Sequence, residues 1–158
     1  MLKKFLLLLL LAAFSQRLTA QNDTSIIGKW KIIAVNIGVG YNYKKDSLFV
    51  TSNMQQSLVG RKDSAREIAI RSIFVRRYRE DYFIFDDKLN YQELRNGAQR
   101  AAGTYAVNKT LRTIEVLYST DKARPRIVRY AFEKNNLILY MPSIVNDEEA
   151  EYTLEKSQ

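Results

Sequence analysis

Cysteine and histidine are both absent from this chain of 158 residues. Without a thiol, the chain has no disulfide, no thiolate metal site and no cysteine nucleophile. Without an imidazole, it lacks the general base of His-assisted serine or cysteine catalysis and the commonest protein ligand of zinc. Carboxylates, tyrosines and lysines remain, but the usual catalytic set is missing. We therefore expect no enzyme activity, no metal and no cofactor.

Proline and glycine are scarce, with two and six residues respectively. This composition disfavours disordered linkers, and the sequence has no internal repeat. Positive charge exceeds negative charge, with 25 Lys and Arg against 17 Asp and Glu. The cations are dispersed and accompany no nucleic-acid motif, so we interpret most of them as a solvated surface. The length suits one domain with a sizeable core.

The N-terminal segment carries the features of an export signal. Two lysines precede an apolar run, Phe5–Phe14, that contains six consecutive leucines. Ala20 is the small residue that a signal peptidase requires at its cleavage point. A membrane anchor is the alternative, but a helix of this run reaches about 15 Å, whereas a bilayer core is about 30 Å thick. We expect cleavage after Ala20, a mature domain of residues 21–158 that does not span the membrane, and a location in the periplasm or outside the cell.

From Gly28 onward, most of the chain alternates short β-branched or aromatic segments with turn residues, which is typical of antiparallel strands. We predict eight strands, over Gly28–Ile37, Tyr82–Phe85, Lys88–Leu94, Gly103–Val107, Leu111–Tyr118, Arg126–Phe132, Leu137–Met141 and Glu151–Glu155. Eight sequential antiparallel strands can close into an up-and-down β-barrel, which leaves no exposed sheet edge. Alternation predicts one inward-facing set, formed by Trp30, Ile32, Phe83, Phe85, Tyr105, Val107, Ile114, Val116, Val128, Tyr130, Phe132, Leu137 and Leu139.

Residues 53–80 have a different pattern. Ser64 and Glu67 have the spacing of a capping box with Ser64 at the N-cap, so we predict one helix over about Ala65–Arg79. Its apolar residues do not fall on one stripe, and its β-branched content leaves a strand open as an alternative for part of it. Five arginines make this the most basic stretch of the chain.

The segment Ile27-Gly28-Lys29-Trp30 has a Gly-x-Trp pattern at the start of the first predicted strand. Together with the strand count, it resembles the lipocalin-like proteins exported by Gram-negative bacteria. Further matches are an aromatic strand with an acidic turn, a second glycine–aromatic strand start and a closing strand, at Tyr82–Asp87, Gly103–Tyr105 and Tyr152–Lys156. The resemblance implies that Trp30 plugs the barrel base and that Gly28 permits close packing. It transfers no ligand-binding residue. The classical family places its helix after the last strand, whereas an inserted helix is shared with fatty-acid-binding relatives.

The first functional hypothesis is a carrier or sensor of a small apolar ligand inside the barrel. A barrel of about eight strands is just wide enough to hold one small ligand or to be filled by its own side chains. Aromatic residues of the strands would line such a pocket, and the candidates are Tyr105, Tyr118, Tyr130, Phe83 and Phe85. The simpler interpretation of each tyrosine is an ordinary strand residue.

The second hypothesis is a module that binds an envelope protein or an anionic surface through the predicted helix. Arg71, Arg76 and Arg77 lie next to aromatic residues, which is the composition of interface hot spots. A solvated helix face is the simpler explanation. Nucleic acid is not an expected partner, because export places the protein away from most of it.

The third hypothesis, an enzyme, rests on the carboxylates of Asp86-Asp87 and Asp147-Glu148-Glu149. Neighbouring residues on a strand point to opposite faces, which argues against a shared acid–base site. The first pair is more simply a hairpin turn, and the second group is a solvated loop or a weak calcium site. The sequence therefore favours non-catalytic binding.

Overall fold

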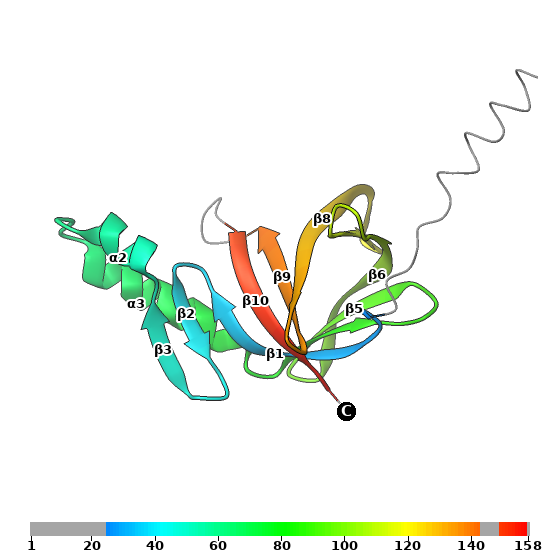
Figure 1. Cartoon of the computed structure of the whole chain (residues 1–158), viewed down its shortest axis with the longest axis horizontal. Helices are drawn as coiled ribbons and strands as arrows, with labels where there is room; N and C mark the ends of the chain where they lie inside the picture. The colour runs from blue at the N-terminus through cyan, green and yellow to red at the C-terminus, as the bar shows by residue number, and fades with distance from the viewer. Residues whose placement is uncertain (1–24, 143–148, 158) are drawn as a thin grey trace, which may run out of the picture.

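The computed structural model describes residues 25–142 and 149–157, and its main feature is a closed antiparallel β-barrel (Figure 1). Eight strands follow one another around the barrel in the order β1, β4, β5, β6, β7, β8, β9 and β10, and β10 closes the ring by pairing with β1. Their bounds are Gly28–Asn36, Asp81–Phe85, Asn90–Arg95, Ala98–Asn108, Thr113–Tyr118, Asp121–Glu133, Asn136–Pro142 and Glu149–Lys156. The predicted up-and-down barrel is confirmed.

Two hairpin turns follow the chemistry of their sequences. Asn96 and Gly97 connect β5 to β6 with positive φ angles of 50° and 81°, as a two-residue type I′ turn requires. Asp86 follows β4, and its side chain accepts hydrogen bonds from the backbone N–H groups of Lys88 and Asn90 (3.0 and 2.7 Å). Hydrogen bonds from Asn90 hold the pKa of Asp86 below its usual value. Asp86 therefore builds the turn between β4 and β5.

Strand β6 begins at Ala98 rather than at Gly103, where the sequence predicted its start. The prediction missed Ala98–Ala102 because this stretch has none of the β-branched and aromatic residues that favour strands. Gly103 instead lies within β6, where an added Cβ would be 2.1 Å from the carbonyl oxygen of Leu117 on β7. Glycine at this position permits the close approach of two neighbouring strands.

Strand β8 begins at Asp121, well before the predicted start at Arg126. The predicted strand starts directly after Pro125, because proline lacks the N–H that a strand ladder uses. Pro125 is tolerated here because the pairing of β7 with β8 shifts register between Val116 and Tyr118. An irregularity of this kind is where a sheet accepts proline.

A lobe is inserted between β1 and β4 and projects from one side of the barrel (Figure 1). It consists of β2 Val39–Asn42, β3 Ser47–Val50, α2 Ser52–Leu58, α3 Ser64–Val75 and the short 3₁₀ helix η1 Arg76–Tyr78. The predicted inserted helix is confirmed as α3, while β2, β3 and α2 were not predicted. The first half of β1 pairs with β4 and its last residues pair with β2, so the lobe continues the barrel sheet.

The capping box predicted at Ser64 is wrong, because Asp63 occupies the N-cap of α3 and its side chain makes no capping hydrogen bond. The Asp63 carboxylate is instead paired with Arg61 at 3.0 Å. Helix α2 has the side-chain cap, since Thr51 Oγ1 accepts from the N–H of Met54 at 3.3 Å. The strand alternative for this region is also wrong, because α3 is helical throughout its length.

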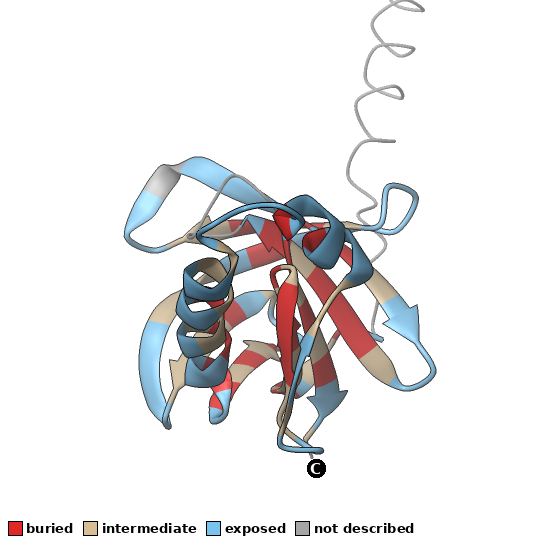
Figure 2. Cartoon of the chain, turned by 90° about the vertical axis from the view of Figure 1, so that its left-hand side faces the viewer, coloured by how far each residue is buried: buried red, intermediate tan, exposed pale blue. Residues whose placement is uncertain are grey.

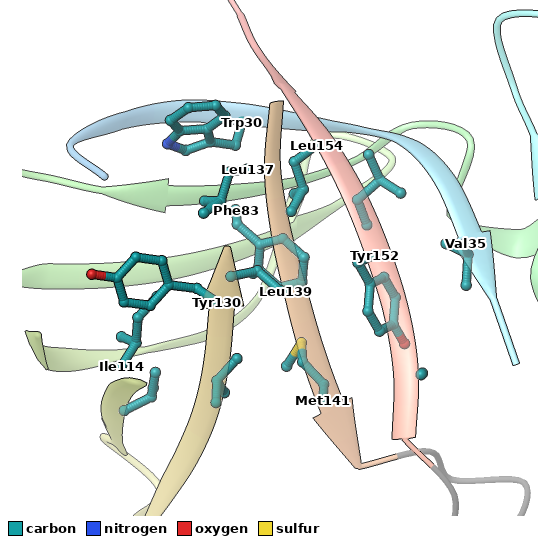
Figure 3. Close-up of a cluster of buried hydrophobic side chains, with 14 of the residues drawn as sticks. Trp30, Val35, Phe83, Ile114, Tyr130, Leu137, Leu139, Met141, Tyr152 and Leu154 are labelled. Carbon is teal, nitrogen blue, oxygen red and sulfur yellow. The ribbon is translucent and has the colours of Figure 1, made fainter. Parts of the chain in front are cut away.

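The barrel interior is filled mainly by apolar side chains, with Trp30 at one end of the cluster and Met141 at the other (Figure 3). Trp30 is buried, and its Nε1 donates a hydrogen bond to the carbonyl oxygen of Ile26 at 2.7 Å. Gly28 has a φ of 147°, and the Lys156 side chain passes directly against it. The Lys156 ammonium then lies over the Trp30 ring, 5.5 Å from its centroid. Gly28 thus leaves room for the side chain that covers Trp30.

The predicted inward-facing set is buried with one exception. Phe132 is 39% exposed, so its assignment to the barrel core is wrong. It lies one residue before the end of β8, and its ring contacts Trp30 with the centroids 6.2 Å apart. The alternation of β8 persists to this point, but the strand has reached the edge of the barrel.

Candidate functional site

A cavity of about 70 Å³ lies at the end of the barrel away from Trp30. We call it the barrel mouth, and it is lined by Ile32, Tyr78, Asp81, Tyr82, Phe83, Glu93, Leu94, Arg100, Arg126, Met141, Pro142 and Tyr152. Phe83, Met141 and Tyr152 lie close together in Figure 3 and form an apolar wall. Four charged residues supplied by β4, β5, β6 and β8 share the same cavity.

Asp81 is the most buried charged group of the barrel mouth, with 6% of its surface exposed. Its Oδ2 accepts a hydrogen bond from Arg95 Nε at 3.0 Å. Its Oδ1 is buried and has no hydrogen-bond partner among the described residues. Burial raises the pKa of Asp81, and the guanidinium groups of Arg95 and, less strongly, Arg100 oppose that rise only in part. A hydrogen-bond donor that reached Oδ1 would therefore lower the free energy of the ionised form.

Glu93 lines the barrel mouth and is hydrogen-bonded to two tyrosines that lie behind it. Its Oε1 accepts hydrogen bonds from the hydroxyl groups of Tyr91 and Tyr118, both at 2.8 Å. Burial raises the pKa of Tyr118 to about 12 and that of Tyr91 well above its ordinary value. Both phenols therefore stay protonated at neutral pH and donate to the carboxylate. This arrangement fixes the position of Glu93 within the cavity.

Arg100 and Arg126 place two exposed cations at the rim of the barrel mouth. Neither forms a hydrogen bond or ion pair with any residue that the structure describes, although Arg126 lies over the ring of Tyr118, 5.3 Å from its centroid. Arg100 is the extra residue of a β-bulge, because Glu93 pairs with Ala101 while the next residue of β5 pairs with Gln99. A bulge redirects a side chain relative to the regular alternation.

The structure places one of the five predicted ligand-binding residues, Phe83, in the wall of the barrel mouth. Tyr118 lies behind the mouth, where its hydroxyl donates to Glu93. Phe85 and Tyr105 pack edge to face in the core, with their centroids 5.1 Å apart. Neither Phe85 nor Tyr105 lines the barrel mouth.

The remaining predicted ligand-binding residue, Tyr130, is buried within β8. It contributes to a hollow of about 260 Å³ that is separate from the barrel mouth. Two cations, Lys109 and Arg112, line the same hollow together with Ala131 and Phe132. The structure therefore does not bring Tyr130 together with Phe83 in one site.

The predicted partner-binding arginines have different environments. Arg71 is buried, donates from Nε to Glu67 at 2.7 Å and also donates to the carbonyl oxygen of Ile37. Its assignment to a binding surface is therefore wrong, because it ties α3 to the segment that follows β1. Arg76 and Arg77 are both exposed on η1.

The predicted acidic group, Asp147-Glu148-Glu149, is described only in part. Asp147 and Glu148 lie outside the described residues, while Glu149 forms an ion pair with Arg129. Within residues 25–142 and 149–157, no three carboxylates gather in a way that would hold a metal ion. No helix of the same residues is long and apolar enough to cross a membrane.

Sequence reasoning missed the charged groups of the barrel mouth, although the pattern marks most of them. Asp81 occupies alternate positions with the buried Phe83 and Phe85 along β4, so its carboxylate lies on the same inward face. Glu93 follows Tyr91 in the same way on β5, and Arg126 precedes Val128 on β8. A charged residue at an inward position is the available signal.

Comparisons with known proteins give one structural similarity. No protein family model matches the chain, and no curated protein matches it. The chain is similar to the crystal structure of a DUF4847 family protein from Bacteroides vulgatus ATCC 8482, with 13% sequence identity and a TM-score of 0.43. That alignment covers 84% of this chain and 96% of the other.

Proposed function

We propose that this chain is an exported, non-catalytic binding protein that holds a small, partly apolar ligand at the barrel mouth. The observation that carries the proposal is the combination of an apolar wall with a buried carboxylate oxygen, Asp81 Oδ1, that has no donor within the part of the chain that the structure describes. Ligand pockets usually combine apolar walls with a few oriented polar groups. The barrel mouth has both, whereas the rest of the barrel is filled by its own side chains.

The size of the barrel mouth limits what enters it. Its volume is about 70 Å³, whereas pockets for drug-sized ligands have about 300–1,000 Å³. Only one end of such a ligand fits without movement of the surrounding side chains. We therefore restrict the predicted class of apolar ligands to molecules with one polar end, which lies inside the mouth.

Three features support a binding protein rather than a catalyst. The chain has no cysteine or histidine to act as nucleophile or general base. The two carboxylates of the mouth already have structural partners, since Arg95 holds Asp81 and two tyrosines hold Glu93. Export, proposed from the N-terminal segment, also suits a carrier or sensor of small molecules in the envelope.

Native mass spectrometry of the mature protein, purified from its own envelope without detergent, tests this proposal. The expected result is a bound mass of a few hundred daltons that is lost on denaturation. A matched pair of variants locates the ligand: Met141→Trp narrows the mouth and should reduce the bound fraction, while Leu111→Trp, in the exposed turn before β7, should not. A protein without a bound mass that also takes up nothing from an envelope lipid extract would contradict the proposal.

A second candidate function, docking of an acidic partner on the lobe, is favoured by the continuous outer face of α3 and η1. Arg66, Ile70, Ile73 and Arg77 recur at helical spacing, and Ile70 and Ile73 are 49% and 60% exposed. Figure 2 shows that the outer side of the lobe helices is largely exposed. An apolar pair between two arginines suits an envelope partner or an anionic surface. This function becomes the preferred one if the protein carries no small ligand.

A further inference from the structure

We propose that the barrel mouth recognises a zwitterionic head group, with its ammonium held by Asp81 and its carboxylate held by Arg100 and Arg126. The ligand class is an α-amino acid with an apolar side chain. This inference rests on the proposed function, since it names the chemistry of the ligand that the mouth binds.

The acidic side of the mouth requires a donor. Asp81 Oδ1 is buried without a hydrogen-bond partner among the described residues, while Arg95 engages Oδ2. An ionised carboxylate oxygen that is buried and unpaired carries a large desolvation cost, which also explains the raised pKa of Asp81. An ammonium group supplies three N–H donors and a compensating charge. Glu93 lines the same cavity and adds a second negative charge to this side.

The basic side of the mouth requires an anion. Arg100 and Arg126 line the cavity at its rim and form no ion pair with a residue that the structure describes. A guanidinium binds a carboxylate with two parallel hydrogen bonds, so two of them suit one ligand carboxylate. A ligand with only an acid group would leave Asp81 without a donor. A ligand with only an amine would bring no anion to either arginine, although the charge of Arg100 also acts on the Asp81 carboxylate.

The apolar side of the mouth favours a hydrocarbon side chain. Phe83, Met141 and Tyr152 line the cavity beside the charged groups (Figure 3). Their position lets the first carbons of a side chain pack against rings and a thioether while the head group meets the charges. The volume of about 70 Å³ is smaller than the roughly 150 Å³ of a cavity that holds benzene, so the head group and a few carbons fill it.

Calorimetry with three probes that share one alkyl chain tests the inference on the mature wild-type protein. The probes are α-aminooctanoate, octanoate and octylamine. We expect α-aminooctanoate to bind about tenfold or more tightly than either single-charge probe, because each loses one set of charged hydrogen bonds. If octanoate bound as tightly as α-aminooctanoate, the role of Asp81 would be wrong. If octylamine bound as tightly as α-aminooctanoate, the role of the arginines would be wrong.

The same experiment separates this inference from the proposed function. If a small molecule copurifies with the protein but none of the three probes binds, the zwitterion is wrong and the binding function stands. If nothing copurifies and no probe binds, both fail. If the probes bind and Met141→Trp weakens them while Leu111→Trp does not, the mouth is the site.

Charge variants assign the two halves of the head group. Asp81→Asn should weaken α-aminooctanoate about tenfold without weakening octanoate, because it removes the charge that holds the ammonium. Arg100→Gln and Arg126→Gln should weaken both acids without weakening octylamine. Lys109→Gln removes one positive charge away from the mouth and should change none of the three affinities. If Asp81→Asn does not fold, the probe series on the wild type still decides the question.

Discussion

Asp81 shows how one residue gives the barrel mouth its chemistry, because its two carboxylate oxygens have different partners. Oδ2 accepts from Arg95, whereas Oδ1 is buried without a described donor. Arg95 also stacks over the ring of Tyr78, 5.3 Å from its centroid, which fixes the guanidinium beside the carboxylate. Burial therefore disfavours the ionised form of the Asp81 carboxylate, and the protonation of this group is coupled to the stability of the folded protein.

We predict that Asp81→Asn gains stability relative to the wild type as pH rises above about 4. Burial raises the pKa of Asp81 in the folded state, so the folded protein holds this proton more tightly than the unfolded chain. The stabilisation that this bound proton gives the folded state is therefore complete below the ordinary pKa of the group. It is lost as pH rises through the raised pKa of the folded state. Each tenfold increase in proton affinity is worth about 1.4 kcal/mol.

Urea unfolding of the two proteins at several pH values measures this difference. Only the difference between the two proteins is informative, since Asp46, Asp63 and Asp86 have lowered pKa values that act in the opposite direction. A pH-independent difference would show that Asp81 titrates alike in the folded and unfolded states. Arg95 would then compensate the burial of the carboxylate completely.

The residue pattern predicts the inward position of three mouth residues and cannot predict the fourth. Asp81, Glu93 and Arg126 share the parity of buried neighbours, so alternation alone places them inside the barrel. Arg100 reaches the mouth through a bulge, which changes the parity of β6 at that point. A bulge depends on how two strands pair, and that pairing is not visible in the local sequence.

At the scale of elements, β1 connects the barrel and the lobe because it pairs with different strands along its length. Its residues from Gly28 to Lys31 pair with β4, and those from Ala34 to Asn36 pair with β2. The lobe has a small apolar cluster of its own, formed by Val39, Met54 and Leu58. Such a small cluster contributes less stability than the barrel core, so the lobe depends on its attachment.

Arg71→Ala should destabilise the lobe by about 3 kcal/mol while the barrel strands keep their protection. The change removes the hydrogen bond to the carbonyl oxygen of Ile37 and leaves Glu67 without its cation. Amide hydrogen exchange should therefore accelerate in α3 and β2 and stay unchanged in β9 and β10. Arg66→Ala, on the exposed face of the same helix, is the matched control and should change stability by less than about 0.5 kcal/mol. Equal acceleration in β9 and β10 would mean that lobe and barrel unfold as one unit.

The strands of the lobe were harder to predict than those of the barrel, because glycine interrupts their sequence pattern. The first predicted strand ends at Ile37, because Gly38 and Gly40 follow and glycine weakens strands. Gly40 lies in β2 opposite Phe49 of β3, and an added Cβ would be 2.1 Å from that ring. The glycine is there to accommodate the aromatic ring of its cross-strand neighbour. That contact joins two strands of which neither alone has a strong strand pattern.

At the scale of the whole molecule, the order of the strands from β4 to β9 was predictable because the turns between them are short and locally encoded. A two-residue turn fixes an antiparallel neighbour, so successive hairpins fix the strand order. Closure then requires that β1 meets β10, which occurs from Trp30 to Asn36. The position of the lobe follows from the split pairing of β1 and from Arg71, and neither has a sequence motif.

The proposed export is a property of the whole chain, because it removes the N-terminal segment before the barrel begins. Within the described residues, the first buried side chain is Ile26, whose carbonyl oxygen accepts from Trp30 Nε1. Cleavage after Ala20 leaves this hydrogen bond in place. We predict that the protein recovered from the periplasm of a Gram-negative host begins at Gln21, which intact-mass measurement detects directly.

The matched variants for this prediction are Ala20→Arg and Ala12→Val. Ala20→Arg places a large charged residue where the peptidase requires a small one, so the uncleaved precursor should accumulate in the membrane fraction. Ala12→Val keeps the apolar run and should be processed normally. Recovery of the wild type with Met1 still attached, in the same fraction as cytoplasmic proteins, would contradict export. The binding function would then have to be sought among cytoplasmic ligands, while the chemistry of the barrel mouth would be unchanged.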